Sequence, residues 1–228
     1  MRLAPLALAF AAFAALPAWA AAQEAVSIPV IDRGDGDMRA AVDIVFRASA
    51  IAGEVDSGLD LDYSDIFGAG SGFGLEGAFL WPTGHVDVGG YLALNWDLYR
   101  GESWSDAVGD TLKPDTMNVR SFLFGGKGIL SVDKNFYVEF HAGFGIVSYE
   151  KVDGVLTISG APLDITVFKA SSSFAFDIGA RVGVLLGHLF GELGFGLRSQ
   201  GPPKEGDLAF DSLPASVASF EIAFGLRF

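Results

Sequence analysis

The sequence predicts an all-β protein whose eight-stranded antiparallel transmembrane β-barrel is preceded by a cleaved signal peptide. Apolar and polar residues alternate along eight segments, which is the period of a β-strand with two different faces. Nearly all charged residues of these segments fall on one of the two faces. After residue 22, no stretch offers the roughly 18 consecutive apolar residues that a spanning helix needs.

The composition excludes several classes of function. The chain has 28 acidic and 15 basic residues, a formal net charge of −13, and it lacks the basic face that nucleic-acid binding requires. It has no cysteine, which excludes a disulfide scaffold, a thiolate metal site and a cysteine nucleophile. Half of the residues are hydrophobic, so the chain is not disordered.

The first 22 residues have the pattern of a secretory signal peptide. Arg2 supplies the positive charge, residues 3–16 are apolar, and small residues at Ala18, Ala20 and Ala22 offer cleavage sites. An uncleaved membrane anchor is the alternative interpretation. We therefore expect a signal peptide at 1–22, a periplasmic N-terminal segment at 23–39 and the barrel at 40–228.

Four segments of the first half alternate, and they comprise residues 41–52, 72–81, 85–99 and 119–130. The first three place charged side chains such as Asp43, Glu76 and Asp87 opposite an apolar face. The fourth is less regular, because Arg120 shares the face of its phenylalanines whereas Lys127 lies on the other face. Each segment reaches the roughly 9–11 residues that cross a bilayer as a tilted strand.

Four segments of the second half repeat the pattern more sharply, and they comprise residues 136–148, 174–186, 189–199 and 217–228. The fifth segment sets phenylalanines against Glu139 and His141, and the sixth sets Phe, Ile and Val against Arg181. The last two place Glu192 and Glu221 opposite Leu and Phe. An even count of strands puts both chain termini on the same side of the membrane.

The polar face is predicted to line the inside of the barrel as a charge network that plugs the lumen, since eight strands leave room only for side chains. Its members are Asp43, Arg47, Glu76, Asp87, Asp97, Lys127, Glu139, His141, Asp177, Arg181, Glu192, Arg198, Glu221 and Arg227. We expect Arg181 to pair with Glu139 or Asp177. A soluble barrel with its apolar face inward also explains the alternation. The many glycines on the polar face favour a narrow membrane barrel, where space inside is short.

The connections alternate in length. Three are tight, at residues 82–84, 131–135 and 187–188, and four are long and polar, at residues 53–71, 100–118, 150–173 and 200–216. This is typical of outer-membrane barrels, with short periplasmic turns and long external loops. The acidic loops lack the spacing of a calcium-binding EF-hand, so we expect solvated loops and no metal.

The sequence resembles the small eight-stranded outer-membrane barrels of Gram-negative bacteria, the OmpA/OmpX-like type. The last strand carries the resemblance, with apolar residues at alternate positions up to the final residue: Phe220, Ile222, Phe224, Leu226 and Phe228. The resemblance implies a bacterial outer-membrane location, contact with outer-membrane lipid and lipopolysaccharide, and recognition of this strand by the barrel-assembly machinery. The peptidoglycan-binding function of larger members is not carried over.

Aromatic residues at strand ends are predicted to form girdles at the two membrane interfaces. Trp81, Phe136 and Tyr137 would form the periplasmic girdle, and Trp96 and Tyr99 would mark the outer one. Arg120 would lie at the outer rim, where an anionic lipid headgroup can pair with it.

The sequence contains little catalytic chemistry. Its three histidines do not form a Ser-His-acid arrangement, and the glycine clusters at 68–72 and 125–128 lack the spacing of a phosphate loop. We therefore expect a non-enzymatic outer-membrane protein without a cofactor, whose external loops bind an unknown ligand. Two alternatives stay open: a lipid A-modifying hydrolase with His141 or His85 as base, and a conduit for small apolar ligands, which the charged lumen opposes.

Overall fold

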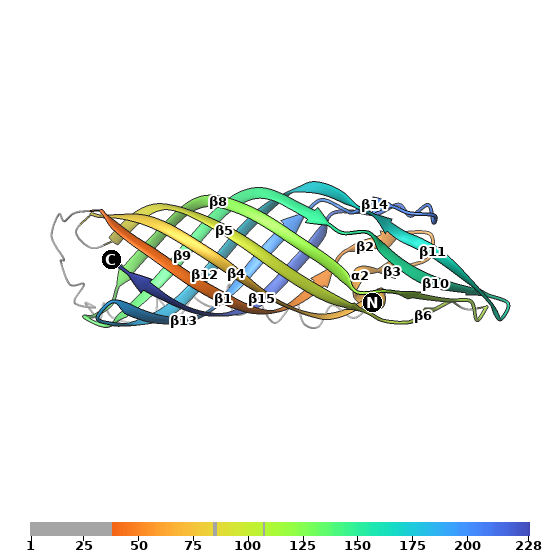
Figure 1. Cartoon of the computed structure of the whole chain (residues 1–228), viewed down its shortest axis with the longest axis horizontal. Helices are drawn as coiled ribbons and strands as arrows, with labels where there is room; N and C mark the ends of the chain where they lie inside the picture. Colours follow the sequence, from red (N-terminus) through yellow and green to blue (C-terminus); the bar gives the residue numbers. More distant parts are fainter. Residues whose placement is uncertain (1–37, 84–85, 107) are drawn as a thin grey trace, which may run out of the picture.

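Eight antiparallel strands close into a single barrel (Figure 1). The computed structural model describes residues 38–83, 86–106 and 108–228, so the predicted signal peptide and most of the segment 23–39 lie outside the described residues. The strands follow one another around the barrel in the order β1 (Arg39–Ala52), β15 (Ala215–Arg227), β13 (Leu189–Gln200), β12 (Ser171–Leu186), β9 (Phe136–Tyr149), β8 (Met117–Ser131), β5 (Val86–Gly101) and β4 (Phe67–Pro82). The predicted eight-stranded antiparallel barrel is confirmed.

The barrel closes where the first strand meets the last. β1 pairs with β15 from Ala41, opposite Arg227, to Ala52, opposite Ser216. Beyond the end of β15, Phe228 exchanges two backbone hydrogen bonds with Ala40, at 2.8 and 3.1 Å. No free edge is therefore left between these two strands, and their backbone groups are paired without water.

Each predicted segment corresponds to one barrel strand, but several strands begin earlier than predicted. β4 begins at Phe67 rather than residue 72, so the glycine cluster 68–72 lies in a strand and not in a loop. β12 likewise begins at Ser171 rather than residue 174. These added residues are mostly small or polar, so hydropathy does not mark them, although their backbones continue the sheet. Arg39, assigned to the N-terminal segment, is the first residue of β1.

The apolar face of the strands points outward and the charged face points inward. Along β9, Phe140 is 54% exposed whereas the neighbouring Glu139 is 1% exposed. Large apolar side chains are exposed in the same way on all eight strands. A soluble barrel with its apolar face inward is thereby excluded, and the exterior has the polarity of a surface that contacts lipid. Among the described residues, no helix is long and apolar enough to cross a membrane.

The two ends of the barrel differ. The end with the short connections, which we call the turn end, also holds the C-terminal Phe228 (Figure 1). The opposite loop end carries further regular structure, although the sequence predicted only long polar loops. The additional elements are β2 (Glu54–Asp56), β3 (Leu61–Asp62), α2 (Tyr63–Ile66), β6 (Trp104–Ser105), β7 (Thr111–Pro114), β10 (Val152–Ile158), β11 (Ala161–Lys169) and β14 (Lys204–Glu205).

Five of the loop strands form a second sheet that extends the molecule beyond the barrel. Its order is β14-β11-β10-β7-β6, so three of the four long connections contribute to it. Tyr63, Phe67 and Phe210 pack around Phe168, with ring centroids 5.9–6.3 Å apart, and all four are buried. The loops therefore have their own hydrophobic core, which joins the inward side chains at the loop end of the barrel strands.

We predict that the closed barrel resists denaturation by dodecyl sulfate until it is heated. Unheated protein should migrate faster on electrophoresis than boiled protein, because the closed sheet keeps the chain compact. Equal mobility of the two samples, together with solubility of the folded chain in the absence of detergent, would contradict a membrane barrel.

A second prediction concerns the turn between β8 and β9. The carboxylate of Asp133 accepts hydrogen bonds from the backbone N–H groups of Phe136 and Asn135, both at 2.7 Å, and these bonds lower the pKa of this carboxyl. A lowered pKa in the folded state means that the carboxylate stabilises the turn above its unfolded pKa of about 3.9, and that this is lost as pH falls through the folded value.

Amide chemical shifts of Asn135 and Phe136, followed by NMR during acidification, should report the titration of Asp133. The midpoint is expected below about 3.9. It should be absent in Asp133→Asn, whose side chain does not titrate. A midpoint at or above the ordinary value would contradict the assigned hydrogen bonds.

Candidate functional site: the charged lumen

Arg181 on β12 is the centre of the lumen, and its side chain is 3% exposed. Its guanidinium lies within 3.5 Å of carboxylates from five other strands: Glu221 at 2.9 Å, Glu139 at 3.1 Å, Glu76 at 3.2 Å, and Asp43 and Glu192 at 3.5 Å. A guanidinium suits this position, because its five N–H donors spread in a plane and the group stays charged when it is buried. One side chain thus links strands all around the barrel.

Lys127 on β8 is the second cation of this cluster. Its ammonium contacts the carboxylate of Glu76 and lies 3.0 Å from that of Glu139. The carboxylate of Glu192 also accepts a hydrogen bond of 2.7 Å from the hydroxyl of Tyr137. Arg181 and Lys127 together face five carboxylates, so the cluster depends on both of them.

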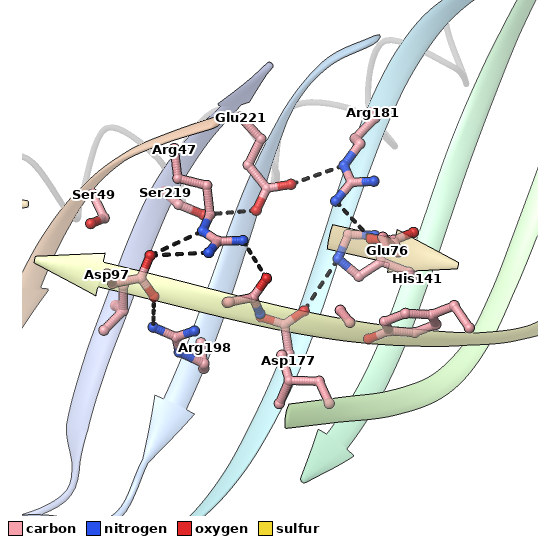
Figure 2. Close-up of a pocket in the computed structure, with 15 residues that line it drawn as sticks. Arg47, Ser49, Glu76, Asp97, His141, Asp177, Arg181, Arg198, Ser219 and Glu221 are labelled. Carbon is pink, nitrogen blue, oxygen red and sulfur yellow. Dashed lines mark hydrogen bonds and ion pairs between the residues drawn. The ribbon is translucent and has the colours of Figure 1, made fainter. Parts of the chain in front are cut away.

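A separate cluster lies closer to the loop end. Asp97 lies between two arginines, 3.1 Å from Arg47 and 2.8 Å from Arg198 (Figure 2). Neutral polar groups complete it, because Asn95 accepts a hydrogen bond from Arg47 at 2.7 Å and donates one to Ser121 at 3.0 Å. All these groups come from inward positions of β1, β5, β8 and β13.

Between the two clusters, His141 faces Asp177, with Nε2 3.2 Å from the carboxylate (Figure 2). A cavity of about 20 Å³ remains there, lined by residues of both clusters. This is enough for about one water molecule. The middle of the barrel is therefore filled by its own side chains.

Glycines on the inner face make room for the large side chains. A Cβ atom at Gly179 would collide with the imidazole of His141, and one at Gly183 would collide with the ring of Tyr137. The glycines of the polar face thus fit the narrow lumen expected of eight strands.

At the turn end of the lumen, the guanidinium of Arg227 lies over two aromatic rings, 4.7 Å from the centroid of Tyr137 and 5.5 Å from that of Phe190.

The structure places every residue of the predicted charge network on the inner side of the barrel. Of the two expected partners of Arg181, Glu139 contacts it and Asp177 does not; Asp177 pairs with His141 instead. Period-two alternation assigns a side chain to a face, but the height at which neighbouring strands pair decides which inward residues meet.

Two residues of the predicted aromatic girdles point the wrong way. Tyr99 is fully buried inside the barrel, and Tyr137 is bound to Glu192 there. Tyr137 directly follows outward-facing Phe136, and Tyr99 lies three positions after outward-facing Trp96, so each must face inward. Trp81 and Phe136 face outward and are exposed at the turn end.

Several residues of the lumen are not among the predicted members of the charge network. Arg39 forms an ion pair of 3.0 Å with Asp87. Tyr91, Asn95 and Ser121 also face inward, and Gln200 accepts a hydrogen bond from Arg198 at 3.0 Å. Period-two alternation places Tyr91 and Asn95 on the same face as Asp87 and Asp97, so the sequence does signal the inward position of these neutral residues.

Among the described residues, no group of three or more His, Asp or Glu side chains is arranged so that it could hold a metal ion. His85, one of the two candidate bases, lies outside the described residues. His141 is described, and its side chain is 3% exposed on the inside of the barrel.

Comparisons with protein-family models and with curated proteins find no match. Solved structures do match. Ail, the attachment invasion locus protein of Yersinia pestis, is 12% identical over 85% of this chain and 100% of its own, with a TM-score of 0.44. The outer-membrane protease OmpT from Escherichia coli is 8% identical over 89% of this chain and 99% of its own, with a TM-score of 0.48.

The outer-membrane enzyme PagL is 13% identical over 79% of this chain and 97% of its own, with a TM-score of 0.46. Two of these three proteins are named as enzymes and one as an attachment protein, so no role passes from them to this chain.

We predict that Arg181→Ala destabilises the barrel by about 3–5 kcal/mol, the usual cost of removing one partner from a buried ion pair. Asp43, Glu192 and Glu221 would then lose the cation that they contact, whereas Glu76 and Glu139 would keep Lys127. The free energy of unfolding can be measured by urea titration in lipid vesicles. Arg100→Ala is the matched control, because Arg100 is an exposed arginine on β5. A change below about 1 kcal/mol, the range of exposed pairs, would contradict the central role of Arg181.

Proposed function

We propose that this chain is a non-enzymatic, integral outer-membrane barrel that presents a structured loop sheet to the outside and conducts no large solute. The segregation of side chains carries the proposal: apolar groups cover the exterior of all eight strands and charged groups fill the interior. A charge on the exterior would cost about 2–4 kcal/mol at the middle of the bilayer for Arg or Lys. A surface in contact with water has no need of this arrangement.

The interior supports a closed plug rather than a pore. The two charge clusters are held by ion pairs that connect different strands, and the cavity between them measures about 20 Å³. An apolar ligand would have to displace buried charges from their partners, which is costly. The conduit for small apolar ligands is therefore the weaker alternative.

The position of His141 argues against the lipid A-modifying hydrolase. Its imidazole lies inside the barrel between Asp177 and Glu139, at 3.2 and 3.7 Å. A base that acts on a lipid must reach the outer surface or the rim, where the substrate lies. Ion pairing within the lumen accounts for the surroundings of His141.

The loop sheet is where a ligand from outside would bind. Binding residues are often held in loops on a rigid scaffold, and here the loops are themselves ordered by the core around Phe168.

The outward-facing residues of the last strand, from Phe220 to Phe228, match the pattern expected of a signal for the barrel-assembly machinery. We include this recognition in the proposal.

Planar-bilayer recordings test the closed lumen. Wild-type protein should show no large, steady conductance, because side chains fill the cross-section. Replacing both arginines that flank Asp97, as Arg47→Ala with Arg198→Ala, removes side-chain volume and should raise the frequency of conducting events. A large, steady conductance of the wild-type protein would contradict the proposal.

A further inference from the structure

A groove on the outer surface of the barrel is not explained by the lumen or by the loop sheet. Its volume is about 520 Å³, and it spans β1, β4, β5 and β8 near the loop end. Its lining residues include the apolar Phe46, Phe73, Trp96 and Leu98 and the polar Ser71, Asn118, Arg120 and Glu150.

The register of the strands explains why the surface is hollow here. Phe46, Phe73 and Trp96 are direct cross-strand neighbours, and the rings of Phe73 and Trp96 stack at 5.1 Å. The next outward-facing residues towards the loop end are Ala48 on β1 and Ser71 on β4, which pair with each other and have small side chains. The groove is thus a recess beside an aromatic wall.

The polar end of the groove is formed by side chains from one strand and the loop that follows β9. Arg120 pairs with Glu150, and Asn118 donates a hydrogen bond of 3.0 Å to the same carboxylate. The two charged side chains are 61% and 42% exposed, so both retain contact with the surroundings. Arg120 is also the cross-strand neighbour of Trp96, so the charged end and the aromatic wall adjoin.

We propose that this groove binds a phosphorylated glycolipid of the leaflet at the loop end. The inference rests on the proposed insertion in a membrane and deepens it by naming a lipid class and its site. The guanidinium of Arg120 would bind a phosphate, Glu150 and Asn118 would hydrogen-bond to sugar hydroxyls, and an acyl chain would lie along Phe46, Phe73 and Trp96. Guanidinium–phosphate pairs are among the stronger hydrogen-bonded contacts.

A glycolipid suits the groove better than a phospholipid for two reasons. A phosphomonoester on a sugar carries more negative charge than a phosphodiester, about −1.5 to −2 near neutral pH, which favours the guanidinium of Arg120. The hydroxyls of a sugar also supply donors for Glu150 and both donors and acceptors for Asn118. The ends of the groove also match the orientation of a lipid in that leaflet. The polar side chains lie towards the loop end, where the headgroup would be, and the apolar side chains lie where the acyl chain would be.

Lipid A and phosphatidylethanolamine are the probes for a binding experiment. In full-length chain with Trp19, Trp81 and Trp104 replaced by Phe, Trp96 is the only tryptophan left. After refolding into nanodiscs, titration of each lipid should change the fluorescence of Trp96, with lipid A acting at the lower mole fraction. Native mass spectrometry of the same samples counts the bound lipids. Lipid A without its phosphates should bind no better than phosphatidylethanolamine.

Three variants separate the groove from other effects. Arg120→Gln should weaken lipid A binding by about tenfold, as expected for loss of a charge-assisted hydrogen bond, and Arg100→Gln, an exposed arginine outside the groove, should leave it unchanged. Glu150→Gln breaks the same ion pair as Arg120→Gln but keeps the guanidinium, so binding should be kept or strengthened.

The outcomes that overturn the inference are distinct from failure of the proposed function. Equal binding of lipid A and phosphatidylethanolamine, or equal weakening by Arg120→Gln and Glu150→Gln, would overturn the glycolipid site. Failure of the refolded chain to enter nanodiscs at all would instead overturn the membrane barrel.

Discussion

Closure of the sheet between β1 and β15 is the constraint on which the rest of the molecule depends. In a hydrocarbon environment, each backbone N–H and C=O group needs a partner within the protein, and a sheet provides this only without free edges. The continuous register from Ala41 to Ala52, extended by the hydrogen bonds between Ala40 and Phe228, meets the requirement. Because side chains alternate along each strand, closure also sends every second residue to the inside.

The interior follows from closure. Eight strands leave a lumen that is only as wide as its side chains, so charges brought inside are forced into contact and must pair. Arg181 pairs with carboxylates from five strands at once, and Asp97 pairs with both Arg47 and Arg198. The same contacts that compensate the buried charges also fill the cross-section, which links the stability of the barrel to its closed state.

The sequence predicted the strands well because period-two alternation is a local signal. It assigned Glu139 to the inside and Phe140 to the outside correctly. It could not predict that Asp177 pairs with His141 rather than Arg181, since this depends on the relative height of neighbouring strands. Tyr99 and Tyr137 were wrongly assigned to the aromatic girdles on the outside, because they lie near strand ends. Their position in the alternation places both of them inside the barrel.

The structure of the loop end could not be predicted from the sequence. The core around Phe168 brings Tyr63 and Phe67 together with Phe210, which lies far along the chain from both, and the residues follow no common period. The outer groove depends in the same way on register, because it places small Ala48 and Ser71 beside the stacked rings of Phe73 and Trp96. Both features become visible only when the strands are paired.

Spin-label scanning along β9 tests most directly whether lipid surrounds an interior filled with charges. The chain has no cysteine, so single cysteines can be introduced from residue 138 to 147 and labelled after refolding into vesicles. Our account predicts alternation: labels at even positions such as Phe140 are accessible to oxygen dissolved in lipid, and labels at odd positions such as Gly143 are not. Accessibility without this alternation, or access of a water-soluble relaxing agent at the even positions, would contradict it.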